Sequence, residues 1–72
     1  MKFHFTNHAQ VGMSERGIST MRVMDAIRRP DRRYAARDGA VACERAFGAK
    51  TLRIICRERK KGEYVIITAY HL

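Results

Sequence analysis

Hydrophobic residues in the first third of the chain recur at helical spacing. Ala9 and Met13 lie four residues apart within residues 8–16, which predicts a first helix that Thr6 or Asn7 caps. Gly17 can end this helix in a left-handed turn, because glycine has no Cβ that clashes there. The preceding stretch, KFHFT, alternates polar and apolar residues and predicts a short edge strand or an extended arm.

A second helix is predicted over the stretch TMRVMDAIRR, residues 20–29. Ser19 can cap its start, and Pro30 ends it, since the residue before a proline avoids helical angles. The apolar residues of this stretch form a stripe that we expect to face the core. Its members are Met21, Met24 and Ile27, with Val23 and Ala26 widening the stripe.

After Pro30 the hydrophobic pattern changes to the period of two that is typical of strands. RRYAARD and VACERAF, joined by a turn at Asp38–Gly39, predict one hairpin. TLRIICRER and YVIITAY, joined by KKGE, predict a second hairpin. The predicted fold class is therefore α+β, with two N-terminal helices packed on a four-stranded antiparallel sheet in a single domain over residues 1–72.

Alternation assigns the side chains of the last two strands to two faces of the sheet. We expect the apolar sets to face the helices: Leu52, Ile54 and Cys56 on one strand, and Val65, Ile67 and Ala69 on the other. The opposite face, which we call the open face, then carries Arg53, Arg57, Thr68 and Tyr70. A shift of one residue would exchange the two faces.

The composition adds a strong positive charge. Fifteen Lys and Arg against seven Asp and Glu give a net charge of +8 in 72 residues. Most of these cations are arginines, whose planar guanidinium suits phosphate. The charge predicts a polyanionic partner, which can be RNA, DNA or an acidic protein. A charge that only keeps the domain soluble is the alternative.

The two cysteines and the hydropathy pattern bear on location. Cys43 and Cys56 lie in predicted strands without the spacing of a zinc motif. We interpret them as buried free thiols, with a disulfide or a metal site as the alternatives. No apolar run reaches the roughly 18 residues that cross a bilayer, and the N-terminus lacks the pattern of a signal peptide. These features predict a cytoplasmic protein with no membrane partner.

Three stretches resemble the domain-of-unknown-function family numbered 4258. HAQVGMSERGIS is similar to its opening motif, TLRIICRER to its penultimate strand and YVIITAY to its closing strand. The resemblance covers essentially the whole chain. CERAFG, residues 43–48, also resembles the Glu-Arg…Gly stretch of BrnT-like toxins. Gly12 is a departure, since the family usually has Arg or Lys there.

The family is grouped with small ribonuclease toxins of the RelE and BrnT type. The resemblance therefore implies a compact fold of sheet and helices, metal-independent cleavage of RNA without a cofactor, and often a neighbouring antitoxin protein. Such cleavage needs a base, an acid, and cations that stabilise the charge developing on phosphorus. Histidine suits the first two roles because its reference pKa of about 6.5 is near working pH, and arginine suits the third.

The predicted catalytic residues are His8, Arg16, Arg45, Thr68 and Tyr70. His8 is the expected acid or base, the two arginines bind and stabilise phosphate, and Thr68 and Tyr70 position it. The residues predicted to follow the RNA backbone are Arg53, Arg57, Lys60 and Lys61. His4 and His71 join the site only if the chain ends lie close together. The three histidines share no motif, so no metal site is predicted.

Simpler interpretations of the same residues stay open. His8, Glu15 and Arg16 share a face of the first helix, and Glu15 orients His8 only if side chains reach across the space left by Gly12. Otherwise this face is solvated, and Arg16 interacts favourably with the helix macrodipole. Arg45 shares a strand face with apolar residues, so it should be paired or lie at a cleft.

The rival to a ribonuclease is a binding module that uses the same basic face without catalysis. A homodimer or an antitoxin complex is also expected, because the core is small and an exposed apolar edge such as YVIITAY would invite pairing.

Overall fold

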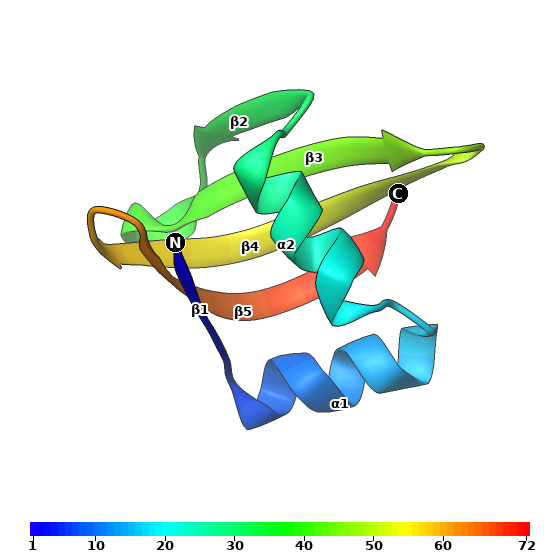
Figure 1. Cartoon of the computed structure of the whole chain (residues 1–72), viewed down its shortest axis with the longest axis horizontal. Coiled ribbons are helices and arrows are strands. Elements are labelled where there is room, and N and C mark those ends of the chain that lie inside the picture. Colours follow the sequence, from blue (N-terminus) through cyan, green and yellow to red (C-terminus); the bar gives the residue numbers. More distant parts are fainter.

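The computed structural model describes all 72 residues as two α-helices packed with a five-stranded sheet (Figure 1). The helices are α1, Asn7–Arg16, and α2, Thr20–Arg28. The strands are β1, Lys2–Phe5; β2, Arg32–Ala35; β3, Val41–Phe47; β4, Lys50–Lys60; and β5, Glu63–His71. One turn of 3-10 helix, η1, Arg37–Gly39, joins β2 to β3. In Figure 1, α2 crosses β3 and β4 on one face of the sheet, while α1 runs along β5.

The strand order is β1-β5-β4-β3-β2, and β1 is parallel to β5 while the other neighbours are antiparallel. The predicted four-stranded antiparallel sheet is wrong in this respect, because KFHFT forms a fifth strand and makes the sheet mixed. β1 satisfies backbone groups of β5 that would otherwise lie unpaired at an edge. β1 pairs with Glu63–Ile66, so this part of YVIITAY is an inner strand, whereas the rest of β5 keeps an outer edge without a strand partner.

Both helices have the caps that the sequence predicts. Thr6 Oγ1 accepts a hydrogen bond from the Ala9 N–H at 3.0 Å, and Ser19 Oγ accepts one from the Arg22 N–H at 3.2 Å. Gly17 ends α1 in a left-handed conformation with φ of 66°. These contacts satisfy N–H groups and carbonyls that a helix end leaves without partners, so the helix bounds follow from local sequence.

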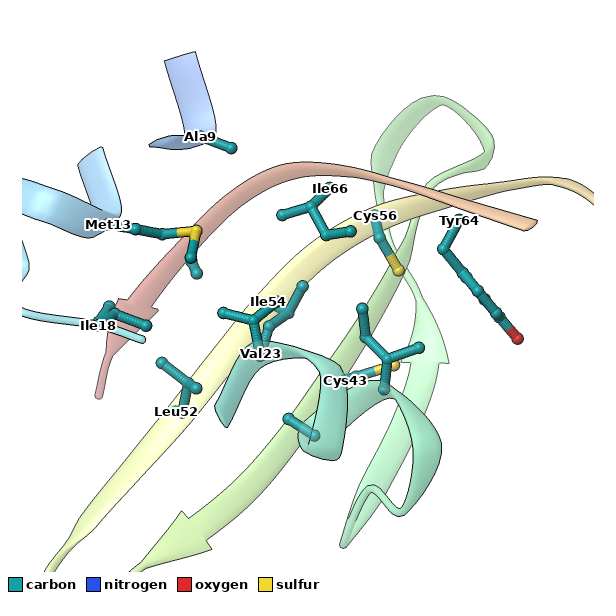
Figure 2. Packing of buried hydrophobic residues seen from close by; sticks show 13 residues of the cluster. Ala9, Met13, Ile18, Val23, Cys43, Leu52, Ile54, Cys56, Tyr64 and Ile66 are labelled. Carbon is teal, nitrogen blue, oxygen red and sulfur yellow. The ribbon is translucent and has the colours of Figure 1, made fainter. Parts of the chain in front are cut away.

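The core lies between the helices and the sheet, as Figure 2 shows. Its members are Ala9, Met13, Ile18, Val23, Ala26, Ile27, Cys43, Leu52, Ile54, Cys56, Tyr64, Ile66 and Ala69. Both cysteines are free and buried, which confirms that interpretation. The expected core position of Met21 is wrong, because this side chain is 68% exposed. Met21 precedes Val23 by two residues, or about 200° around the helix, and so points to the opposite side.

A β-bulge in β5 changes the predicted faces of that strand. Ile55 pairs with Thr68 while the next residue, Cys56, pairs with Ile66, so Ile67 is an extra residue. Ile66 is fully buried in the core, whereas Val65 and Ile67 are only half-buried. The expected apolar set of Val65, Ile67 and Ala69 is therefore wrong for its first two members. Thr68 and Tyr70 follow the bulge and lie on the open face.

The two ends of the chain lie far apart. His4 pairs with Val65 near the start of β5, whereas His71 pairs with Leu52 at the end of β5. Six strand residues at about 3.3 Å each separate these levels, and in Figure 1 the N-terminus lies in the left half of the view and the C-terminus in the right half. His4 and His71 therefore do not join a common site. Neither α1 nor α2 has the length and apolar character that would let it cross a membrane.

A candidate nucleic-acid interface on the open face

One row of side chains crosses four strands on the open face. The register aligns Arg32 with Glu44, Glu44 with Arg53, and Arg53 with Tyr70. The neighbouring row contains Tyr34, Ala42, Ile55 and Thr68. Five of these residues form a connected group, which we call the open-face cluster: Arg32, Tyr34, Glu44, Arg53 and Tyr70.

Glu44 is the centre of the open-face cluster and the one charged residue in the buried set, with 4% exposure. Arg53 Nε donates a hydrogen bond to Glu44 Oε2 at 2.8 Å, and Arg32 Nη1 donates one to Oε1 at 3.5 Å. The Tyr34 hydroxyl also donates to Oε2. Burying a carboxylate is costly unless it is paired and hydrogen-bonded, and three donors meet that condition here.

These contacts shift the ionisation of the residues that make them. The hydrogen bond from Tyr34, together with the hydrogen bond and charge of Arg53, holds the pKa of Glu44 below its ordinary value. The hydrogen bond to Glu44 raises the pKa of Tyr34, because ionising that hydroxyl would place two negative oxygens together. Hydrogen bonds to Tyr70 and Glu44 raise the pKa of Arg53. Near neutral pH, Glu44 is therefore an anion, Tyr34 is neutral and Arg53 is a cation.

Arg53 connects the buried carboxylate to Tyr70. Its Nη1 donates to the Tyr70 hydroxyl oxygen at 3.2 Å, and its Cζ lies 5.7 Å from the centroid of the Tyr70 ring. Because the Tyr70 oxygen accepts this bond, its own proton is free for donation to a ligand. The Arg53 side chain keeps 29% of its surface exposed, so its guanidinium is accessible to a ligand as well.

The open face is suited to an extended anionic chain. The molecule contains no pocket, so a ligand on this face lies on a surface. Arg32 and Arg53 each lie against a tyrosine ring, at 5.1 Å for the ring of Tyr34 and 5.7 Å for that of Tyr70. Guanidinium groups bind phosphates, and aromatic rings stack on unpaired bases. This combination of groups is typical of surfaces that bind single-stranded nucleic acid.

The structure places the predicted catalytic residues on different surfaces. Thr68 and Tyr70 share the open face. Arg45 lies on the opposite face, half-buried, where its Nη1 donates to the Asp25 carbonyl at 3.4 Å and its Cζ lies 5.3 Å from the Phe47 ring centroid. Because the sheet separates them, Arg45 is not brought together with Tyr70.

His8 and Arg16 are exposed residues of α1. No hydrogen bond or ion pair joins either of them to the open-face cluster. The helix that carries them nevertheless packs along β5, the strand that carries Thr68 and Tyr70. α1 packs against β5 through Ala9 and Met13, on the core face of the sheet. The structure therefore does not assemble the five predicted catalytic residues into one contact network.

The predicted backbone-following cations also divide into two groups. Arg53 belongs to the open-face cluster, and Arg57 lies four residues further along β4, where its Nη1 donates to the Asp38 carbonyl. Lys60 and Lys61 lie at the β4–β5 hairpin, and Lys60 Nζ is 3.8 Å from Glu63 Oε2. The two arginines share the open face with Tyr70, whereas the two lysines lie at the hairpin end of the sheet.

The sequence analysis missed Arg32, Tyr34 and Glu44. The signal that identifies Glu44 is the two-residue turn at Gly48 and Ala49. Phe47 pairs with Lys50 across this turn, and a turn of fixed length sets the register of the whole hairpin. Counting back from it places Glu44 opposite Arg53, a cross-strand pair of opposite charge.

Comparison with known proteins gives a family match. No curated protein and no solved structure matches the chain. Within the structure itself, no group of three or more His, Cys, Asp and Glu side chains is arranged to hold a metal. The family described as Domain of unknown function (DUF4258) matches residues 5–71, from the end of β1 to the end of β5. The chain therefore belongs to the family described as Domain of unknown function (DUF4258).

Proposed function

We propose that the protein is a small ribonuclease that binds single-stranded RNA across the open face. The observation that carries this proposal is the contact between Arg53 and Tyr70, which the buried Glu44 holds in place. It presents a guanidinium nitrogen and a hydroxyl oxygen 3.2 Å apart on the open face. The resemblance of CERAFG to BrnT-like toxins, and the grouping of the family with ribonuclease toxins of the RelE and BrnT type, support the same activity.

The chemistry is an internal transfer within the RNA. The 2′-oxygen attacks the neighbouring phosphorus, the bond from phosphorus to the 5′-oxygen breaks, and the products are a 2′,3′-cyclic phosphate and a free 5′-hydroxyl. A base takes the proton of the 2′-hydroxyl, and an acid gives a proton to the 5′-oxygen. Arg53 stabilises the charge that develops on the phosphoryl oxygens, and the Tyr70 hydroxyl supplies the proton.

His8 is the proposed base. Imidazole is suited to accept a proton near neutral pH. Because α1 packs against β5 from the core face through Ala9 and Met13, this role requires an RNA that passes around the edge of β5 between Tyr70 and His8. Glu44 is unsuited to this role. Its three hydrogen-bond donors and its lowered pKa make it a weak base, and its burial keeps it from a substrate. Glu44 is therefore a residue that positions Arg53.

The test compares variants that each delete one hydroxyl. Tyr70→Phe keeps the ring and is expected to reduce cleavage of a mixed-sequence RNA by about 100-fold or more, the size of a lost general acid, with RNA affinity nearly unchanged. Tyr34→Phe is the matched control, because its hydroxyl reaches only Glu44. It is expected to retain cleavage at equal concentrations of folded protein. Equal cleavage by wild type and Tyr70→Phe would exclude the proposed role of Tyr70.

Binding without cleavage is the second candidate function. The separation of Arg45 from Tyr70, and the absence of a contact from His8 to the open-face cluster, favour it. RNA that binds to wild type but stays intact would support this alternative. Expression in a growing bacterial culture gives a second readout, since a ribonuclease toxin arrests growth and Tyr70→Phe should not. An antitoxin protein that covers the open face would prevent both the arrest and the RNA binding.

A further inference from the structure

Gly12 lies in the middle of α1, where glycine costs about 1 kcal/mol relative to alanine. Its backbone does not require glycine, since Gly12 is not among the residues with positive φ. A Cβ added at Gly12 would meet one neighbouring side chain, that of Arg16. It would overlap Nη1 of the guanidinium, and Cζ lies 3.6 Å away. The structural consequence of glycine at this position is therefore that Arg16 can fold back across α1.

The folded-back guanidinium lies on a stripe with His8. His8, Gly12 and Arg16 are spaced four residues apart, so they follow one another on one side of α1. The stripe borders the buried side of the helix, which Ala9 and Met13 occupy. Because the Arg16 guanidinium lies at the level of Gly12, it is one helical turn from His8 instead of two. The group that reaches across Gly12 is therefore Arg16, whereas the sequence analysis considered Glu15.

The charge of Arg16 is not neutralised within the protein. None of the ion pairs involves Arg16, His8 or Glu15. Arg16 and His8 are both exposed, so their N–H groups are available to a ligand. A guanidinium beside an imidazole offers several hydrogen-bond donors and positive charge to the oxygens of one phosphate group.

We propose that Gly12 positions the Arg16 guanidinium against α1, so that Arg16 and His8 together bind a phosphate group. Gly12 is a positioning residue in this site, and Arg16 and His8 are the ligands. The phosphate group is either free phosphate or part of a phosphodiester backbone, since both present the same oxygens. This site lies on α1 and shares His8 with the proposed cleavage of RNA, but phosphate binding by Arg16 and His8 does not depend on the open-face cluster.

The test uses substitutions that change the helix and the guanidinium separately. Gly12→Ala is expected to raise the melting temperature, because alanine is the better helix former. It is also expected to weaken phosphate binding by up to about tenfold, because the added Cβ displaces the Arg16 guanidinium and a hydrogen bond to a charged group is worth about this much. Ser14→Ala is the matched control, because it also improves helix propensity at an exposed position of α1 and should leave binding unchanged. Gly12→Ala should therefore raise stability and weaken phosphate binding, whereas Ser14→Ala should raise stability alone.

The readout is the NMR signal of the His8 imidazole during titration with inorganic phosphate, and separately with a short oligouridylate. Wild type should give a saturable shift that Arg16→Ala abolishes and Gly12→Ala weakens. A response to both probes supports a site for phosphate groups in general. A response to oligouridylate alone supports the proposal with the phosphodiester backbone as the ligand.

Three results would overturn the proposal. The first is unchanged phosphate binding in Gly12→Ala. The second is that Gly12→Ala weakens binding as much in the Arg16→Ala variant as it does in wild type. The third is the absence of a His8 shift with either probe. Arg53→Ala removes a cation of the open-face cluster and should leave the response to inorganic phosphate unchanged. A failure of the open-face proposal is therefore distinguishable from a failure of this one.

Discussion

Glu44 fixes the positions of the arginine side chains around it on the open face. Guanidinium groups repel one another, and long side chains lose rotamer entropy when they are fixed. Glu44 offsets both effects, because its carboxylate accepts hydrogen bonds from Arg32, Tyr34 and Arg53. Two cations and one anion leave the cluster with one excess positive charge. The charge that remains at Arg53 is therefore held in a defined position beside Tyr70.

The lowered pKa of Glu44 predicts a pH-dependent effect of Glu44→Gln on stability. The folded protein lowers this pKa below the unfolded value, so the charge favours folding above about pH 4.3, the reference value for glutamate. This contribution is lost as the pH falls through the lower folded pKa. Thermal unfolding should show that Glu44→Gln has a lower melting temperature than wild type at pH 7, and that the difference shrinks towards pH 3.

Glu15→Gln is the control for this comparison, because Glu15 is exposed and forms no ion pair. It should change the melting temperature little at either pH. If the deficit of Glu44→Gln were the same at pH 7 and pH 3, the charge of Glu44 would not be its source.

The pKa of Cys43 favours reaction of its thiol, whereas the burial of Cys43 and Cys56 opposes it. A hydrogen bond with Cys56, assisted by the charge of Arg33, lowers the pKa of Cys43 to about 7, while the same hydrogen bond and burial raise the pKa of Cys56. A lower pKa favours reaction of Cys43, but both thiols are fully buried. Since a reagent must reach the sulfur before ionisation matters, we expect burial to control the rate.

Both thiols should therefore react slowly with a disulfide reagent such as DTNB in the native protein and rapidly in denaturant. The two native rates should be similar, because the same opening of the core exposes both side chains. Rapid native labelling of Cys43 alone would show that its lowered pKa outweighs its burial.

At the scale of elements, local signals predict the helices well and long-range pairing poorly. Thr6, Gly17 and Ser19 are recognisable caps because each acts within a few residues of its own helix. Alternation in KFHFT predicts a strand or an arm but does not identify its partner, β5, which lies about 60 residues away in the sequence. The bulge at Ile67 has no glycine to indicate it, so the expected faces of Val65 and Ile67 were wrong.

The candidate site was predictable to the same extent. Strand alternation places Arg53, Thr68 and Tyr70 on the open face without knowledge of the partners of each strand. Glu44 and Tyr34 become visible as members of a site only when three strands are aligned across two registers. The folding back of Arg16 depends on a side-chain conformation, which a pattern of residue types does not contain.

The attachment of β1 gives a prediction at this scale. Phe3 packs against Tyr64, with ring centroids 6.0 Å apart, and Arg28 Cζ lies 5.2 Å from the Phe3 ring centroid. Phe3→Ala should lower the free energy of unfolding by about 1–2 kcal/mol, less than the 3–5 kcal/mol for a fully buried phenylalanine, as measured by chemical denaturation. Phe3→Leu keeps an apolar side chain and should cost less. Wild-type stability in Phe3→Ala would mean that β1 contributes little to the fold.

For the whole molecule, the distribution of charge constrains how copies of the chain associate. The outer strands of the sheet are β1 and β2, each of four residues, and they carry Lys2, Arg32 and Arg33. Short, charged edges disfavour pairing between sheets. A homodimer stays a prediction, and the outer edge of β5 beyond Ile66 is the part of the sheet without a strand partner. Light scattering over a range of protein concentrations measures it, and a constant monomer mass would contradict it.

The net charge of +8 also makes a general attraction to RNA the main competitor of a defined interface. The salt dependence of RNA affinity separates the two, because each neutralised phosphate of a single strand contributes about 0.7 to the slope of log affinity against log salt. Three open-face arginines, Arg32, Arg53 and Arg57, predict a slope of magnitude about 2 by the same rule.

Arg57→Gln should reduce the magnitude of this salt slope by about 0.7. Arg29→Gln, an exposed position at the end of α2, removes the same charge from the chain and should leave the slope unchanged. Equal reductions in both variants would mean that RNA is attracted by the charge of the whole molecule, and the open face would then not be the interface.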